Sequence, residues 1–286
     1  MVCRLVSVLI GEKTFMKYYD QHIHSSISDD CDTPMAEMAL AAADLGLSGV
    51  TFTDHCDIEH YETGKIDPDC YDGPARRTVF EDARERAEGR TEVLFGIEIG
   101  SANHHPDVAA SIAADGFDLV IASVHNLAGL PDFYSLGRDG RLEDEAEDVR
   151  LLERYAIEHL ELVRQGGFDV VGHIGYPLRY MEPCCPGLSL EPFRDIFAEA
   201  LRMMTEKGIA LELNTSCFRQ GMVCTPEPWL LRLYKDLGGE LVTLGSDSHE
   251  PALIGAGFDE GADMLRSVGF SRITRFINRK PEFVGL

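Results

Sequence analysis

Short apolar runs alternate along the chain with longer stretches whose apolar residues recur at helical spacing. Seven of the runs have the composition of β-strands and lie at residues 17–22, 49–53, 92–97, 118–123, 168–172, 209–213 and 241–245. Several of them, such as the segments LVIAS and IALEL, are apolar at nearly every position. Parallel strands that helices cover on both faces have this pattern, whereas half-exposed strands alternate polar and apolar residues. The runs therefore predict a parallel sheet.

Between these strands the spacing predicts helices at residues 34–45, 75–88, 106–114, 143–164, 189–207, 226–237 and 258–268, and one more strand at 272–276. Thr33 and Ser189 are suitable N-caps for the first and fifth helices, and Gly208 suits the end of the fifth. Repeated strand–helix units without a break in composition predict a single α/β domain. Seven or eight such units favour a closed, TIM-like (βα)7 barrel over an open sheet.

The first fifteen residues stand apart from this pattern. They contain a short apolar run after Arg4, but neither the longer apolar region nor the small-residue cleavage site of a secretory signal. Met16 then opens a segment that is typical of a first strand. We expect the barrel domain to span residues 16–286 and residues 1–15 to be a non-native or disordered extension. A short additional strand is the alternative for this segment.

Charge and cysteine content narrow the classes of function. Lys and Arg number 26 against 49 Asp and Glu, which gives a formal net charge of −23. Such a chain repels nucleic-acid backbones and anionic membranes, so neither is an expected partner. The eight cysteines include no C-x-x-C pair, which excludes a zinc ribbon. The simplest interpretation of these cysteines is reduced thiols in a cytoplasmic protein.

Polar side chains gather at the carboxyl ends of the predicted strands. Six of the ten histidines occur there, and two carboxylates join them: His22, His24, His55, His125, His173, His249, Glu98 and Asp247. In a parallel barrel these ends lie on one face, where active sites are built. A lone histidine after a strand is usually structural. Eight chemically suitable residues on one face point instead to a site.

Spacing indicates that this site holds metal. Side chains two residues apart on a strand point to the same side, which applies to His22 with His24 and to Asp247 with His249. The set is larger than one tetrahedral zinc uses, since zinc takes about four ligands. We therefore expect two or three divalent ions, with Glu98 or Asp247 as a bridge. Mixed imidazole and carboxylate ligands suit Zn, Fe or Mn.

These residues stand in an ordered series of short motifs. The series comprises DQHIH at residues 20–24 followed by Asp30, TDH at 53–55, GIEIG at 96–100, SVH at 123–125, GHIGY at 172–176 and GSDSH at 245–249. In this order the motifs resemble the PHP (polymerase and histidinol phosphatase) domain family, and within it the histidinol-phosphate phosphatases. Gly175 departs from the acidic residue that phosphatase members often carry there. Asp29 is the local alternative to Asp30.

The resemblance implies a distorted seven-stranded βα barrel and a division of the metal ligands into three sets. One set comprises His22, His24, Glu98 and Asp247, a second comprises Glu98, His125 and His173, and a third comprises Asp30, His55 and His249. It also places phosphate-binding arginines in the loops that contain Arg179 and Arg219. Arginine suits this role because its planar guanidinium can bond two phosphate oxygens.

The predicted function is metal-dependent hydrolysis of a small phosphomonoester. The resemblance points to L-histidinol phosphate, which water would convert to L-histidinol and phosphate in histidine biosynthesis. Glu98, Asp247 and His249 would act through the bound metals and a hydroxide. No Walker loop or dinucleotide fingerprint is present, so no nucleotide cofactor is implied.

Three other functions remain open from the sequence. A PHP-type phosphoesterase could act on another small phosphate ester or on a nucleotide. An amidohydrolase-like metal hydrolase also begins with H-x-H, but no lysine stands at the end of a middle strand. The cluster could also store or sense metal without catalysis.

Several remaining residues carry structural expectations. Asp54 is expected to support His55 from behind, since a metal-bound histidine normally needs an orienting partner. Asp57 and His60 are candidates for lining the pocket, and His159 is expected to be solvent-exposed on its helix. Ordinary roles are expected for His104 and His105 in a loop and for Trp229 in packing.

Overall fold

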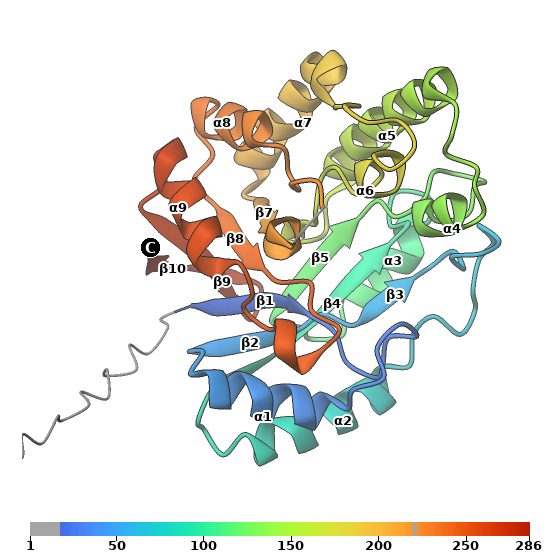
Figure 1. Cartoon of the computed structure of the whole chain (residues 1–286). Helices are drawn as coiled ribbons and strands as arrows, with labels where there is room; N and C mark the ends of the chain where they lie inside the picture. Colours follow the sequence, from blue (N-terminus) through green and yellow to red (C-terminus); the bar gives the residue numbers. More distant parts are fainter. Residues whose placement is uncertain (1–17, 220–221) are drawn as a thin grey trace, which may run out of the picture.

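The computed structural model describes residues 18–219 and 222–286 (Figure 1). Seven parallel strands form a nearly closed barrel in the order β1 (Tyr19–Ile23), β2 (Gly49–Phe52), β4 (Glu92–Gly100), β5 (Leu119–Ser123), β6 (Val170–Val171), β7 (Ala210–Asn214) and β8 (Val242–Gly245). This arrangement confirms the predicted α/β barrel. Residues 1–15, for which an extension was predicted, lie outside the described residues.

The ends of the sheet approach each other where β8 meets β1. The main-chain nitrogen of Asp247 donates to the carbonyl of His22 at 2.7 Å. Two residues after His22, the main-chain nitrogen of His24 donates to the carbonyl of Ser248 at 2.9 Å. These bonds join the segments that follow the two strands, so the first and the last predicted ligand motifs lie side by side.

Helices surround the strands, as the apolar patterns predicted. They are α1 (Met35–Leu45), α2 (Gly73–Arg86), α3 (Pro106–Ala113), α5 (Glu145–Gln165), α7 (Arg194–Lys207), α8 (Pro228–Asp236) and α9 (Phe258–Val268) (Figure 1). Alternate residues of β5 serve different apolar clusters. Leu119 and Ile121 pack with residues of neighbouring strands, whereas Val120 and Ala122 belong to the larger core that includes the helices. The strands are therefore buried on both faces, which explains their continuous apolar sequence.

Two predicted helix starts are corrected by the structure. Pro34 is in an extended conformation, so α1 begins at Met35 and Thr33 does not cap it. A short 3₁₀ turn at Glu191–Phe193 precedes α7. The hydroxyl of Ser189 accepts a hydrogen bond from the main-chain nitrogen of Glu191 at 3.0 Å instead of capping the helix. Gly208 ends α7 in the left-handed conformation, with φ of 70°, as predicted.

The structure adds elements that the apolar pattern did not predict. The short strand β3 (His55–Asp57) pairs with β4, and it places His55 in register with Glu98. Two short helices, α4 (Phe133–Arg138) and α6 (Leu178–Met181), lie within segments that follow β5 and β6. Each of these elements lies near the carboxyl ends of the strands. Their residues therefore reach the region where the predicted ligands gather.

The predicted strand near the carboxyl terminus forms a separate hairpin. It is β9 (Arg272–Ile277), and it pairs with β10 (Lys280–Gly285) in antiparallel orientation. Arg275 of this hairpin forms an ion pair with Glu92, the first residue of β4. The hairpin therefore lies against the amino ends of the barrel strands, away from the predicted ligands.

Candidate metal centre

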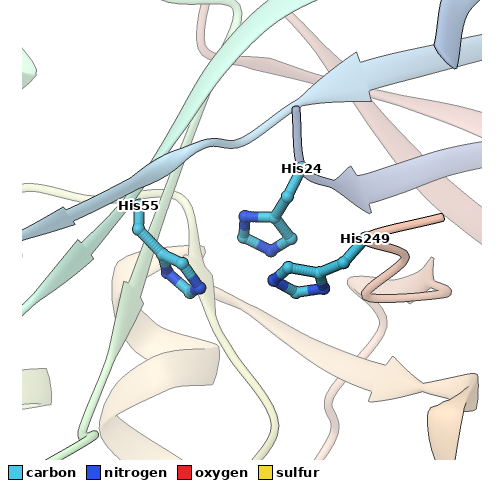
Figure 2. Close-up of side chains that lie close together, drawn as sticks. All are labelled: His24, His55 and His249. Carbon is cyan, nitrogen blue, oxygen red and sulfur yellow. The ribbon is translucent and has the colours of Figure 1, made fainter. Parts of the chain in front are cut away.

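All nine predicted ligands lie together at the carboxyl ends of the barrel strands. Three of their imidazoles, from segments far apart in the sequence, turn toward one another in Figure 2. The ring centroid of His24 lies 4.2 Å from that of His55 and 4.2 Å from that of His249. This convergence arises because parallel strands present their carboxyl ends on the same face of the barrel.

The Glu98 carboxylate lies at the centre of the cluster and is fully buried. Its Oε1 atom lies 2.8 Å from Nε2 of His173 and 3.2 Å from Nε2 of His125. Its Oε2 atom lies 3.2 Å from Nε2 of His22 and 2.9 Å from Nδ1 of His55. The two oxygens therefore face two different groups of imidazoles, which is the geometry of a bridging carboxylate.

Two aspartates extend the cluster beyond Glu98. Oδ1 of Asp247 lies 3.3 Å from Nε2 of His24, and Oδ2 of Asp30 lies 3.1 Å from Nε2 of His249 and 3.5 Å from Nε2 of His55. Asp247 adopts a positive φ of 53°, a conformation that non-glycine residues rarely take. Strained backbone of this kind is concentrated at functional sites, where the surrounding structure enforces it.

The arrangement of donor atoms fits divalent metal ions. Four sets of three side chains bring their ligand atoms within 4.8 Å of one another: His24, His55 and His249; His22, His24 and Asp247; His22, Glu98 and His173; and His55, Glu98 and His125. Buried polar atoms normally have hydrogen-bond partners. Here five central atoms form no hydrogen bond among the described residues, although several of them lie close to one another: Nε2 of His22, His24 and His249, Nδ1 of His55 and Oε2 of Glu98. Metal coordination would satisfy them, and the overlapping sets suit more than one ion.

Further carboxylates hold the imidazole rings in position. Oε1 of Glu212 lies 2.6 Å from Nδ1 of His22, and Oδ1 of Asp57 lies 2.8 Å from Nδ1 of His125. Metal-binding histidines usually have such a partner on the second ring nitrogen, which fixes the tautomer. Sequence reasoning missed Glu212, although it is the only charged residue in the apolar IALEL strand.

Asp54 supports His55, as predicted, but it does so through Ser28 and the backbone rather than through the ring. Its carboxylate accepts hydrogen bonds from the main-chain nitrogen of Ser25 at 2.6 Å and from the hydroxyl of Ser28 at 2.9 Å, and none from the His55 ring. The hydroxyl of Ser28 in turn accepts the main-chain nitrogen of His55 at 2.9 Å. Asp54 thus fixes the backbone of His55 through Ser28. The strand β3, which was not predicted, accounts for the difference because it turns the His55 ring toward Glu98.

Burial and charge act differently on the members of the cluster. Nearby carboxylates, against the effect of burial, hold the pKa of His22, His55 and His125 well above its usual value, so these rings must lose a proton when they bind metal. Burial alone would raise the pKa of Glu98, but the imidazoles of His22, His125 and His55 hold it well below its usual value. Burial, together with the neighbouring imidazole of His55, holds the pKa of His24 well below its usual value. Glu98 is therefore ionised and His24 neutral, and these are the ligand forms of the two side chains.

A cavity of about 840 Å³ opens onto the centre. Arg179 lines it, and Nη1 of this arginine lies 3.3 Å from Oδ2 of Asp247. Its Nη2 atom donates to the hydroxyl of Ser216 at 2.8 Å, and its buried Nε has no partner among the described residues. The second predicted arginine, Arg219, donates from Nη2 to the carbonyl of Ser246 at 2.8 Å and is not among the described residues that line the cavity.

Other predicted positions are now placed. Asp57 and His60 both line the cavity, as expected. His159 is buried rather than exposed, because its face of α5 packs against α7 and places the ring near Phe197. Trp229 packs on the same Phe197, which confirms its structural role.

The histidines in the loop after β4 take part in hydrogen bonding. His104 lies between Glu59 and Glu158, at 3.2 and 2.7 Å, and His105 lies 2.8 Å from Glu59. These contacts join three loop and helix segments, which is an ordinary structural role.

Among the described residues, no helix has the length and apolarity needed to cross a membrane.

Comparisons with known proteins agree with this geometry. The model of the PHP domain matches residues 20–216. A probable histidinol-phosphatase from Deinococcus radiodurans is 30% identical over 282 residues, which cover 92% of this chain and 98% of the relative. The histidinol-phosphatase of Lactococcus lactis is 26% identical over 267 residues, which cover 93% of this chain and 96% of the relative.

Solved structures show the same fold. The histidinol phosphate phosphatase from Lactococcus lactis, complexed with zinc, L-histidinol and phosphate, superimposes with a TM-score of 0.77 at 24% identity, over 93% of this chain and 99% of that chain. A putative histidinol phosphatase from Listeria monocytogenes gives a TM-score of 0.71 at 16% identity, over 85% of this chain and 99% of that chain.

Proposed function

The chain belongs to the PHP domain family, and we propose from this that it is a metal-dependent phosphatase that hydrolyses L-histidinol phosphate to L-histidinol and phosphate. The curated relatives described above are named as histidinol-phosphatases and match this chain over nearly its whole length. The observation that carries the proposal is the Glu98 carboxylate, whose two oxygens face separate groups of imidazoles beside a cavity lined by Arg179. Within this proposal the enzyme acts in the cytoplasm, in histidine biosynthesis.

We assign the ligands to two or three divalent ions, Zn, Fe or Mn. The first ion would take His22, His24, Glu98 and Asp247, the second Glu98, His125 and His173, and the third Asp30, His55 and His249. The paired atoms within each set lie no more than 3.8 Å apart, as this division requires. His55 also approaches Oε2 of Glu98 at 2.9 Å, so the third ion would lie next to the other two. When bound, such ions lower the pKa of a water molecule and stabilise negative charge on a phosphoryl group.

The chain's own residues have separate roles in this proposal. Arg179 would bind phosphate oxygens, because its guanidinium lies beside Asp247 at the centre and keeps an unpartnered Nε. Arg219 would assist from the adjacent loop. Glu212 and Asp57 hold the rings of His22 and His125 so that Nε2 of each points toward the centre. The proposed machinery is therefore held in place before substrate binds.

A small substrate suits the charge of the site better than a nucleic acid. The chain has a net charge of −23, which repels a polyanion at long range. Two or three divalent ions would make the mouth of the cavity locally positive. A phosphomonoester can enter this region without bringing a long anionic backbone near the acidic surface.

The test is phosphate release from a panel of small phosphomonoesters by the purified protein, with zinc, iron or manganese supplied. We expect histidinol phosphate to have the highest kcat/KM and elemental analysis to find two or three ions per chain. Sugar phosphates and nucleoside monophosphates serve as comparison substrates. A clear preference for one of these would refute the substrate assignment, and at most one ion in a fully loaded sample would refute the metal assignment.

A further inference from the structure

Two cysteine thiols lie in contact near the carboxyl end of β7. Sγ of Cys217 lies 3.1 Å from Sγ of Cys224. The main chain brings them together, because Asn214 and Thr225 form an antiparallel bridge in which the nitrogen of Asn214 donates to the carbonyl of Thr225 at 2.9 Å. The sulfurs of a disulfide lie about 2.05 Å apart, so these two atoms need to approach by about 1 Å to form one.

The residues next to both cysteines hold Arg179. Its Nη2 atom donates to Oγ of Ser216 at 2.8 Å and to Oγ1 of Thr225 at 3.0 Å. Ser216 directly precedes Cys217, and Thr225 directly follows Cys224. A movement that draws the two sulfurs together therefore displaces the two hydroxyls that position the guanidinium.

The surroundings of the pair favour reaction with a small oxidant. The hydrogen bond with Cys224 lowers the pKa of the Cys217 thiol against the effect of burial, and the positive charge of Arg179 acts in the same direction as the hydrogen bond. The thiolate is the reactive form of cysteine. Cys224 is only half-buried, which leaves the pair accessible to a molecule of the size of hydrogen peroxide.

A second pair of thiols near the cavity provides a comparison. Cys56 is buried in β3 and shares a hydrogen bond with Cys70, which lines the cavity. Cys56 is the neighbour of the proposed ligand His55 in the chain, whereas Cys217 and Cys224 are neighbours of the residues that hold Arg179. Oxidation of the two pairs would therefore act on different parts of the site.

We propose that Cys217 and Cys224 are a modification site at which a peroxide forms a reversible disulfide. The disulfide displaces the hydroxyls that hold Arg179 and lowers the affinity of the enzyme for phosphate groups. Disulfides in cytoplasmic proteins are usually transient and redox-sensing, in keeping with this role. Formation of the bond is independent of the reaction that the enzyme catalyses. Its effect on affinity rests on the proposed phosphatase function, in which Arg179 binds phosphate.

The reaction balances with the peroxide as a two-electron oxidant. The Cys217 thiolate attacks one peroxide oxygen and the O–O bond breaks, so that Cys217 becomes a sulfenic acid and the released hydroxide takes up a proton to form water. The thiol of Cys224 then attacks the oxidised sulfur, the S–O bond breaks, and a second water leaves. Two thiols and one hydrogen peroxide thus give one disulfide and two waters. A small dithiol reverses the step by thiol–disulfide exchange.

The test uses the zinc-loaded enzyme, because zinc undergoes no redox change that could alter the activity. After treatment with hydrogen peroxide, the remaining free thiols are alkylated and the protein is digested. We expect mass spectrometry to find the peptides of Cys217 and Cys224 linked, and dithiothreitol to separate them. KM for histidinol phosphate should rise about three- to tenfold, the effect of losing a neutral hydrogen bond, while kcat changes little. Dithiothreitol should restore KM.

The variant Cys217→Ser removes the attacking thiol and should keep the same KM before and after peroxide. Cys70→Ser is the matched control, because it removes the other thiol pair and should still show the reversible rise in KM. Three results would overturn the inference: no link between Cys217 and Cys224, a link that leaves KM unchanged, or an equal rise in KM in Cys217→Ser.

A binding measurement separates this inference from the proposed function. If the reduced enzyme releases no phosphate from histidinol phosphate, the proposed function is refuted, but the disulfide is still tested by the peptide map. Calorimetric titration of the zinc-loaded protein with inorganic phosphate then replaces KM. Weaker phosphate binding after peroxide would support the modification site, and equal binding, or none in either state, would overturn its effect on Arg179.

Discussion

The Nδ1 atom of His22 lies 2.6 Å from Oε1 of Glu212, and both side chains are buried at the end of the barrel. The other oxygen of Glu212 accepts the main-chain nitrogen of His173 at 2.7 Å. One carboxylate thus fixes the ring of one proposed ligand and the backbone of another. Gly245 makes this possible, because a Cβ at that position would overlap both Glu212 and His22. Removal of the Glu212 charge should therefore affect two of the proposed metal sets together.

We predict that Glu212→Gln lowers metal affinity or kcat by roughly ten- to a hundredfold, the usual cost of losing such an orienting partner. The amide keeps the size of the side chain but presents only one acceptor oxygen for two donors. Metal titration followed by elemental analysis, together with kcat for histidinol phosphate, measures the effect. Glu206→Gln, on the exposed face of α7, is the control. Equal metal affinity and kcat in the two variants would show that Glu212 does not orient His22.

Glu98→Gln should abolish turnover while the fold survives. The variant removes one negative charge from a carboxylate that faces His22 and His55 through one oxygen and His125 and His173 through the other. An amide nitrogen cannot replace the second oxygen as a ligand. Circular dichroism checks the fold, and phosphate release checks the activity. Near-normal rates in this variant would mean that Glu98 is not a bridge.

The ligand positions could be predicted from the sequence because they follow a simple geometric rule. His22 and His24 stand two residues apart at the end of a strand, and the ends of parallel strands share one face. Glu212 escaped this rule because it lies inside the predicted strand at residues 209–213, whereas Glu98 follows the predicted strand at 92–97, and an isolated acidic residue in an apolar run does not reveal its partner. Its role depends on the barrel, which brings β1 beside β8 and close to β7.

Other features depended on tertiary contacts that no local pattern records. His159 belongs to a charged helix segment, but the packing of α5 on α7 decides that it is buried. Asp132 lies in a segment rich in Asp and Gly, where the sequence does not show which aspartate is buried and which is exposed. Only the assembled cavity shows that Asp132 is buried and forms no ion pair within the described part of the chain, whereas Asp139 in the same segment pairs with Arg138.

Substrate binding provides the next prediction. Arg179→Ala should raise KM for histidinol phosphate by a factor that corresponds to about 2–3 kcal/mol, the range of a charge-assisted contact. A contact made in both the ground and the transition state changes KM more than kcat. Arg219→Ala should have a smaller effect, because Nη2 of Arg219 donates to main-chain oxygens of Ser246 and Asp247 at 2.8 and 3.4 Å. Steady-state kinetics of both variants give these values.

Arg138→Ala is the control for this pair, since Arg138 also lines the cavity but is engaged by Asp139 and Glu62. Its KM should match that of the unaltered enzyme. Metal content should stay constant in all three variants, because no arginine is a proposed ligand. Unchanged KM in both Arg179→Ala and Arg219→Ala would contradict the phosphate site, and loss of metal would instead assign the arginines a structural role.

The last prediction concerns stability and pH. His159 is 1% exposed, its Nδ1 atom lies 3.1 Å from the carbonyl of Tyr155, and its buried Nε2 has no partner among the described residues. Burial lowers the pKa of His159 to about 3. An unfolded histidine titrates near 6.5, so between these values the unfolded chain holds a proton that the folded chain does not. Stability from this group is therefore complete above the unfolded pKa and is lost as the pH falls.

The variant His159→Leu should remove this dependence. Between pH 7.5 and pH 5, the free energy of unfolding of the unaltered protein should fall by about 2 kcal/mol more than that of the variant, since each pH unit below the unfolded pKa costs up to about 1.4 kcal/mol. Urea unfolding at a series of pH values measures both curves. The comparison uses slopes, so a constant loss from imperfect packing of leucine against Tyr155 and Phe197 does not affect it. The metal centre contributes its own pH dependence, but that contribution is common to both proteins because His159 is not a proposed ligand. Parallel curves would show that His159 takes up its proton as readily in the folded protein as in the unfolded chain.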